Sequence, residues 1–204
     1  MPIKPLKVGV TGGIGSGKTL VCNIFNTFGI PIYNADRRAK DLMVKDQKVI
    51  EAIKNHFGEE AYLDKKKLNG NYLSAKVFND KRKLKLLNGI VHPAVAADFD
   101  NWSQNQVGKL YIIKEAALLI ESGSYKTLDY LVTITAPVEN RVERVLSRDI
   151  HRSKQDVLDI ISNQLNDGEK ADKSNFIIDN SGQNLLIPQV LKIHEFLISL
   201  KQAG

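Results

Sequence analysis

Short aliphatic segments alternate with longer amphipathic segments along this chain. The aliphatic segments are short enough to be buried strands, and glycine, proline or polar residues bound them. They cover residues 6–11, 30–34, 109–116, 128–136 and 175–180. Apolar residues with helical spacing follow, most clearly in the last segment, 186–200. Because strands alternate with helices, the pattern predicts an α/β fold with a mostly parallel, five-stranded sheet covered on both faces.

Glycine, proline and capping residues predict where several helices begin and end. A helix over about 18–28 should end at Gly29, and Pro137 should open a helix that runs to about residue 148. Ser153 and Asp156 form a capping-box pattern for another helix, and Pro93 is expected to begin one that runs to about residue 106.

The stretch from about residue 37 to residue 92 has an irregular helical pattern, with a turn expected at 69–71. It contains no obvious strand of the central sheet. We therefore expect a helical insertion in the α/β core.

Bulk composition narrows the class of protein. The 204 residues suffice for one buried α/β domain with small additions, and no apolar run is long enough to cross a bilayer. The N-terminus lacks the apolar stretch of a secretory leader, and the single cysteine, Cys22, is expected to pack in the interior, so we expect a cytoplasmic protein. The net charge of +6 permits polyanionic partners. Without a basic tail or an aromatic platform, we expect phosphorylated small molecules as ligands rather than nucleic acid.

The stretch VTGGIGSGKT, at residues 10–19, carries the strongest chemical signal. Gly12, Gly17, Lys18 and Thr19 fit the pattern G-x-x-x-x-G-K-[ST], which binds a nucleoside triphosphate between a strand and a helix. Lys18 is expected to reach the β- and γ-phosphates, and the Thr19 hydroxyl to ligate Mg²⁺. Backbone amides surround the phosphates, and the residues expected to supply them are Gly13, Ile14, Gly15, Ser16 and Gly17. The pattern leaves open whether water or a second molecule receives the terminal phosphate.

An acid follows the second predicted strand, in the triplet Asn34-Ala35-Asp36. Carboxyl ends of parallel strands share one edge of a sheet, so Asp36 can face the phosphate loop and accept a proton from a hydroxyl group. Asp36 can equally cap a helix that begins at Arg37. The two interpretations are compatible.

An arginine series follows the fourth strand. Arg141, Arg144 and Arg148 have helical spacing along one face, and Arg152 lies in a polar break between two helices that can move as a lid. Such arginines can neutralise a phosphoryl group in transfer. The alternative is an exposed helix face paired with neighbouring acids, including Asp149.

Two acids and a histidine are further candidates. Glu115 and Glu121 bracket the apolar stretch after the third strand, where an acid can hold Mg²⁺ through water. The stretch lacks a Walker-B run of four aliphatics ending in Asp, so the pattern assigns the metal to neither glutamate. His92, in the bend before Pro93, is either a local hydrogen-bonding residue or a substrate contact.

In this order, these motifs resemble those of the dephospho-coenzyme A kinase family over most of the chain. The resemblance rests on TGGIGSGKT, NAD, LNGIVHP, ALLIE, RVERVLSRD and FIIDNSG. It implies a P-loop kinase with a parallel core (1–36, 93–140 and 172–204), a helical coenzyme A domain (37–92) and a small lid (141–171). It also implies that ATP and Mg²⁺ are used to phosphorylate the ribose 3′-hydroxyl of dephospho-coenzyme A, the last step of coenzyme A synthesis.

The resemblance implies a role for several individual residues. Asp36 becomes the general base, with Lys18 and Arg144 as its catalytic partners, and Arg148 joins the loop in binding ATP. The acceptor contacts it implies are Asp36, His92, Leu118 and Glu121. Asn34 departs from the family, which has an acid at this position.

Two other functions are weighed against this one. A nucleoside or nucleotide kinase of the same fold is the alternative within the enzyme class. A GTP-dependent switch would carry an N-K-x-D motif, which the chain lacks. Nothing in the sequence indicates an oligomeric state.

Overall fold

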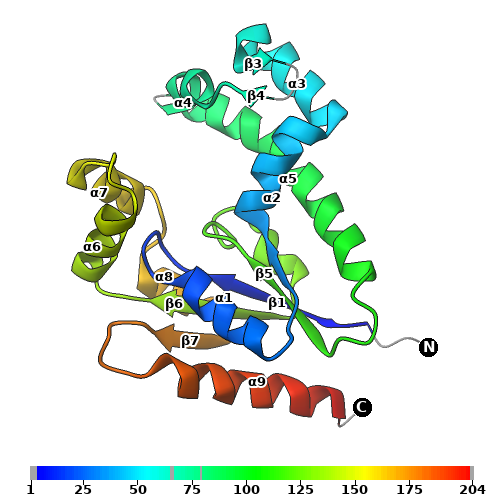
Figure 1. Cartoon of the computed structure of the whole chain (residues 1–204), viewed down its shortest axis with the longest axis vertical. Coiled ribbons are helices and arrows are strands. Elements are labelled where there is room, and N and C mark those ends of the chain that lie inside the picture. The colour runs from blue at the N-terminus through cyan, green and yellow to red at the C-terminus, as the bar shows by residue number, and fades with distance from the viewer. Residues whose placement is uncertain (1–3, 65–66, 79, 203–204) are drawn as a thin grey trace. The chain divides into compact units, whose positions relative to one another are not determined.

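The computed structural model describes residues 4–64, 67–78 and 80–202, and divides the chain into two compact units (Figure 1). The core unit comprises the chain up to Asn34 and from Gln106 onward. The helical unit is Ala35–Asn105.

The core unit is built on a five-stranded sheet with the strand order β2-β5-β1-β6-β7. Every neighbouring pair is parallel, which confirms the predicted α/β fold. The strands are β1 (Leu6–Thr11), β2 (Ile32–Asn34), β5 (Tyr111–Glu115), β6 (Tyr130–Thr135) and β7 (Phe176–Asp179). The register pairs Glu115, the last residue of β5, with Val10 of β1 on one side and with Asn34 of β2 on the other.

Helices cover this sheet and extend from its carboxyl edge. They are α1 (Lys18–Thr27), α6 (Val138–Arg148), α7 (Lys154–Ser162), α8 (Asp167–Ala171) and α9 (Leu186–Gln202), with a short 3₁₀ helix, η2 (Ser124–Thr127). The sequence pattern did not predict α8. The capping box of Ser153 and Asp156 at the start of α7 is confirmed, with its two hydrogen bonds at 3.1 and 2.9 Å.

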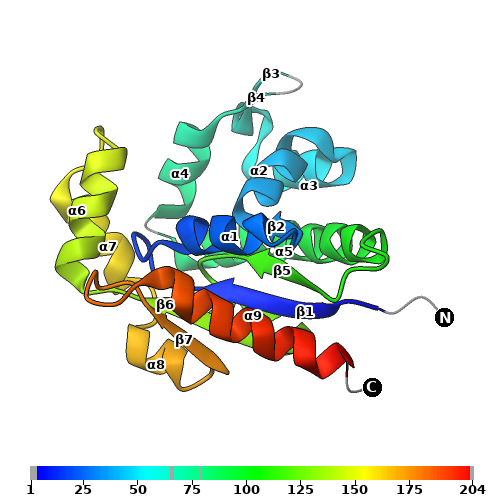
Figure 2. The same cartoon turned by 60° about the horizontal axis from the view of Figure 1, so that its bottom comes forward.

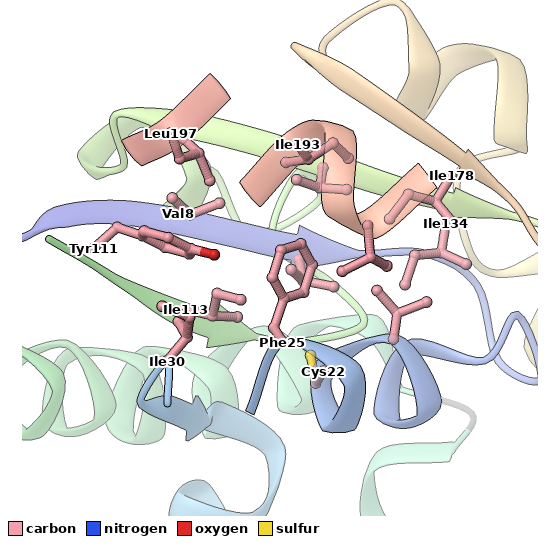
Figure 3. Packing of buried hydrophobic residues seen from close by; sticks show 14 residues of the cluster. Val8, Cys22, Phe25, Ile30, Tyr111, Ile113, Ile134, Ile178, Ile193 and Leu197 are labelled. Carbon is pink, nitrogen blue, oxygen red and sulfur yellow. The ribbon is translucent and has the colours of Figure 1, made fainter. Parts of the chain in front are cut away.

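Helices α1 and α9 lie side by side over one face of the sheet (Figures 2 and 3). Figure 3 shows Phe25 of α1 and Ile193 of α9 pointing into one buried cluster over Val8 and Tyr111. Cys22 belongs to the same cluster, and burial raises the pKa of its thiol well above the usual range. Cys22 is therefore a packing residue, as predicted.

The helical unit has its own apolar core. Its elements are α2 (Ala35–Lys45), α3 (Gln47–Phe57), η1 (Glu59–Ala61), β3 (Tyr62–Asp64), β4 (Lys67–Leu68), α4 (Gly70–Phe78) and α5 (Lys81–Gln104). Val49, Ile53 and Phe57 of α3 are buried together with Tyr62 and Leu73. β3 and β4 form a separate antiparallel pair, so the expectation that this stretch adds no strand to the central sheet is correct.

Two predictions in the helical unit are wrong. Helix α5 begins at Lys81 behind the N-cap Asp80, and Pro93 lies inside it rather than at its start. A proline at that place removes one helical hydrogen bond to Gly89, but Gly89 is exposed, so water can reach its carbonyl. The turn expected at 69–71 is instead the start of α4, where the Asn69 side chain accepts a hydrogen bond from the Tyr72 amide.

The continuous helix α5 also changes the division of the chain. Residues 93–105, which the sequence-based boundaries assigned to the core, belong to the helical unit. No helix in the described ranges combines the length and the hydropathy needed to span a bilayer.

Candidate active site

The phosphate loop joins the end of β1 to the start of α1, as the motif predicts. Gly17 is the residue before α1 and adopts a left-handed φ of 98°. A Cβ at this position would lie 2.1 Å from Nδ2 of Asn180, the residue that follows β7. The same Nδ2 donates a hydrogen bond of 2.7 Å to the Ser16 carbonyl. Both the backbone conformation and the close approach of Asn180 therefore require glycine at position 17.

Lys18 places its ammonium group over the loop. Its Nζ donates hydrogen bonds to the carbonyls of Gly12 and Gly13, at 3.0 and 3.1 Å. The first turn of α1 carries no acidic residue to offset the positive end of the helix dipole. Loop, lysine and helix end together form an environment suited to a polyphosphate.

Thr19 and Glu115 meet beside the loop. The Thr19 hydroxyl donates a hydrogen bond of 3.2 Å to Oε1 of Glu115. Oε2 of the same carboxylate accepts one of 2.8 Å from the side-chain amide of Asn34. Glu115 is only 5% exposed, because it lies on the middle strand of three that end together. A hydroxyl and a carboxylate are oxygen ligands of the type that Mg²⁺ prefers.

The described part of the chain contains no group of three or more His, Cys, Asp or Glu side chains able to hold a metal ion by themselves. Mg²⁺ at Thr19 and Glu115 would leave coordination positions open to further oxygen ligands. Triphosphate oxygens and water are the usual ones for Mg²⁺.

Arg144 and Arg148 line one cavity of about 530 Å³ on helix α6, with Asn140, Glu143 and Ser147. One guanidinium nitrogen of Arg144 donates a hydrogen bond of 2.9 Å to the Asn180 carbonyl. A second one, Nη1, is buried and has no hydrogen-bond partner among the described residues. Since an unsatisfied buried donor is costly, this atom indicates a missing acceptor.

Arg148 is exposed and forms a two-bond ion pair with Asp149, at 2.9 and 3.0 Å. This bond lowers the pKa of Asp149 and raises that of Arg148. Arg152 contacts the same carboxylate at 3.2 Å. Arg148 and Arg152 are thus paired with a neighbouring acid at the surface, which is the alternative that the sequence pattern left open.

Arg141 differs from the other arginines of α6. Its side chain is only 4% exposed and contacts the phosphate loop, whereas Arg144 and Arg148 line the cavity described above. The predicted helical spacing of the three arginines on α6 is confirmed, and their role in phosphoryl transfer stays a prediction.

The residues predicted to contact the acceptor are distributed over both units. In the core unit, Leu118 is 41% exposed, and Glu121 forms an ion pair of 3.0 Å with the buried Lys170. In the helical unit, Asp36 and His92 are both exposed. Asp36 lies in the first turn of α2, which begins at Ala35, so it is not the cap of a helix that starts at Arg37.

Two residues of the site were not among the predicted site residues. Glu115 was noted as a strand-end acid, but only the register of β5 with β1 and β2 places it against Thr19. Asn180 lies in the I-D-N-x-G element and contacts Ser16 and Arg144. These contacts depend on the strand order, in which β6 lies between β1 and β7, and no local pattern specifies that order.

The sequence profile of dephospho-CoA kinase matches residues 6–185. The chain belongs to the dephospho-CoA kinase family. It is 36% identical to the dephospho-CoA kinase of Bacteroides fragilis, over 94% of this chain and 93% of that protein. It is 39% identical to that of Chlorobium chlorochromatii, over 87% and 86%.

Solved structures agree with the family assignment. The dephospho-CoA kinase from Campylobacter jejuni is 28% identical, with a TM-score of 0.66 over 93% of this chain and 95% of that one. A shikimate kinase from Acinetobacter baumannii, 14% identical, matches with a TM-score of 0.52 over 97% and 95%, and shows the shared kinase fold alone.

Proposed function

We propose that this member of the dephospho-CoA kinase family transfers the γ-phosphoryl group of ATP to the ribose 3′-hydroxyl of dephospho-coenzyme A. The products are coenzyme A and ADP, and the reaction is the final step of coenzyme A synthesis. The observation that carries the proposal is the family match over residues 6–185, which includes the loop and each motif quoted above. A single-cysteine chain with a buried thiol is consistent with a cytoplasmic location.

The ATP side of the site is proposed at the phosphate loop. Loop amides between Gly13 and Gly17 surround the phosphates, except that of Ile14, which bonds to Gln164. The Lys18 ammonium moves from the loop carbonyls to the β- and γ-phosphate oxygens. Arg144 supplies its unpartnered buried Nη1 to the nucleotide. Arg148 lines the same cavity. It releases Asp149, its partner in an exposed ion pair, and binds the nucleotide instead. Their charges stabilise the phosphoryl group in transfer.

Thr19 would hold Mg²⁺ on the protein side, with Glu115 beside it. The donor set fits this ion, since both groups offer hard oxygen atoms and Glu115 already contacts the Thr19 hydroxyl. When bound, the ion neutralises charge on the β- and γ-phosphates. Asn34 orients the carboxylate through the hydrogen bond that its side-chain amide donates to Oε2.

On the acceptor side, Asp36 is proposed as the general base that takes the proton of the attacking hydroxyl. It lies two residues beyond the end of β2, and Asn34, the last residue of that strand, contacts Glu115. His92, Leu118 and Glu121 are proposed as further acceptor contacts. Phosphoryl transfer depends mostly on position and charge, so Lys18 matters to turnover at least as much as Asp36.

The test is the choice of acceptor. Turnover of ATP is measured with dephospho-coenzyme A and, separately, with a panel of nucleosides and nucleoside monophosphates. We expect ADP formation with dephospho-coenzyme A and a product phosphorylated at the 3′-hydroxyl, identified by mass and phosphorus NMR. Faster turnover with a nucleoside or nucleotide would favour the alternative kinase. Hydrolysis of ATP that no acceptor accelerates would contradict both kinase proposals.

A further inference from the structure

Ile14, in the middle of the phosphate loop, is held on both of its backbone polar groups by side chains from distant parts of the chain. Its amide donates a hydrogen bond of 2.9 Å to Oε1 of Gln164. Its carbonyl accepts one of 2.9 Å from Nε of Arg141. Side chains therefore determine the orientation of the two peptide groups on either side of the Ile14 Cα. The Ile14 amide, held by Gln164, is not available to a phosphate.

Asp167 in turn holds the Arg141 guanidinium in place. Its Nη1 lies 3.4 Å from Oδ1 of Asp167, and the second oxygen of that carboxylate accepts a hydrogen bond of 3.2 Å from the Ala136 amide. The contact with the loop is close, because a Cβ on Gly13 would lie 2.0 Å from Nη2 of Arg141. A Cβ on Gly15 would lie 2.4 Å from the Arg141 carbonyl oxygen. Two loop glycines thus make room for an arginine and not only for phosphate.

Gln164 belongs to the segment that follows α7. Helices α6 and α7 pack through Val142, Val145 and Val157, and the Ile14 side chain packs against this cluster. The loop, α6 and α7 therefore share one small core. Gln164 supplies the polar contact between that core and the loop backbone.

We propose that Gln164 is a positioning residue for ATP binding, which acts by holding the Ile14 amide in the orientation that the rest of the loop needs. With the acceptor oxygen removed, this amide must find another partner, and the loop loses its single orientation before nucleotide binds. Gln164 acts through Ile14 and does not need to touch the nucleotide. The inference rests on the proposed function only in assuming that the loop binds ATP.

Gln164 can be substituted without disrupting a fully buried core. It lines a cavity of about 920 Å³ together with Arg141 and Asp167, and its own side chain is half-buried. Replacement by leucine removes the acceptor at similar size, while replacement by glutamate keeps an oxygen able to accept from the Ile14 amide. Gln155 of α7 offers a matched control, because its side chain bonds to Asp159 on the exposed surface.

The experiment measures the dissociation constant of Mg·ATP by calorimetry on the full chain, with thermal unfolding and steady-state kinetics alongside. We expect Gln164→Leu to weaken ATP binding about 3- to 10-fold and to raise the KM for ATP, with the KM for dephospho-coenzyme A unchanged. Gln164→Glu should stay within about threefold of the wild type, and Gln155→Leu should equal it.

Unchanged ATP affinity in Gln164→Leu would overturn the inference. So would equal losses in Gln164→Leu and Gln164→Glu, because the acceptor atom would then not matter. A lower unfolding temperature without weaker ATP binding would show that the contact only stabilises the fold, and would also overturn it. Absence of turnover of dephospho-coenzyme A by the wild type would contradict the proposed function, while ATP affinities would still decide the role of Gln164.

Discussion

The hydroxyl of Thr19, in the first turn of α1, donates a hydrogen bond of 3.2 Å to the carboxylate of Glu115 at the end of β5. The two residues are 96 positions apart in the chain. Their contact joins the loop residue expected to ligate Mg²⁺ to a nearly buried acid. The proposed metal site would thus combine one hydroxyl and one carboxylate.

Glu115→Gln should lower kcat about 10- to 100-fold and shift the Mg²⁺ dependence of activity to higher concentrations. The substitution keeps the size of the side chain and its ability to hydrogen bond but removes the charge beside Thr19. Activity is measured against Mg²⁺ concentration at saturating substrates. Glu51→Gln, on the exposed surface of α3, is the control and should change neither quantity. An unaltered Mg²⁺ curve for Glu115→Gln would contradict the assignment of this acid to the metal.

Asp36→Asn should reduce kcat by roughly 10²–10⁴-fold and leave the dissociation constant of ATP near that of the wild type. The amide cannot accept the proton of the attacking hydroxyl. Its effect on folding should be small, since an acid in the first turn of a helix contributes only about 0.3–1 kcal/mol. Turnover and calorimetric ATP binding are measured together.

Asp41→Asn is the matched control for Asp36, because Asp41 lies on the same helix and pairs only with the exposed Lys45 among the ion pairs described. It should retain full turnover. Near-normal kcat in Asp36→Asn would remove this residue from the role of general base.

Glu121→Ala should destabilise the fold by about 3–5 kcal/mol, measured by urea unfolding. Lys170 is completely buried, and without Glu121 its ammonium keeps one long contact, 3.5 Å to the Ala117 carbonyl. Lys170→Met should cost less, because the glutamate left behind is 18% exposed and still accepts a bond from the Leu165 amide. The double variant should be more stable than Glu121→Ala alone.

This series also separates two roles for Glu121. Unchanged stability in Glu121→Ala with a raised KM for dephospho-coenzyme A would make Glu121 a substrate contact rather than the partner of a buried lysine. Lost stability with a normal KM would remove it from the proposed acceptor contacts.

His194 should make the protein less stable as the pH falls below about 6.5. The ring of His194 stacks on Phe28, and its Nδ1 lies 2.6 Å from the hydroxyl of the buried Tyr111. Burial lowers the pKa of His194, and the charge of Glu195 opposes this only in part. Because the unfolded chain takes up the proton at a higher pH than the folded protein, the contribution is complete above the ordinary pKa and is lost on acidification.

The measurement for His194 is urea unfolding at about pH 7.5 and about pH 5.5, for the wild type and for His194→Gln. The wild type should lose more free energy of unfolding between these two pH values than the variant does. An equal loss in both proteins, or a larger one in the variant, would contradict the assignment.

The departure at Asn34 gains a physical explanation from the structure. Its amide nitrogen donates a hydrogen bond of 2.8 Å to Oε2 of Glu115. An aspartate at this position would instead place a second negative charge beside that carboxylate. Asn34 therefore fits a site in which Glu115 carries the negative charge beside Thr19.

The local sequence pattern was sufficient to predict much of the fold. The five strands appear where aliphatic runs predict them, because a strand buried on both faces must be apolar along its length. The phosphate loop and the capping box of α7 follow from short-range geometry that a few residues specify. The pattern fails at Pro93: the proline predicts a helix start there, but α5 continues through it.

The sequence by itself determined the elements of the sheet, the triphosphate-binding loop and the resemblance to a kinase family, since each depends on residues close together in the chain. Only the tertiary structure decided which strand ends meet. The order β2-β5-β1-β6-β7 and its register bring Glu115 to Thr19 and Asn34. Folding of α6 and the α7–α8 connection likewise brings Arg141 and Gln164 to Ile14. These contacts span 81 to 150 positions, and no local periodicity encodes a pairing at that separation.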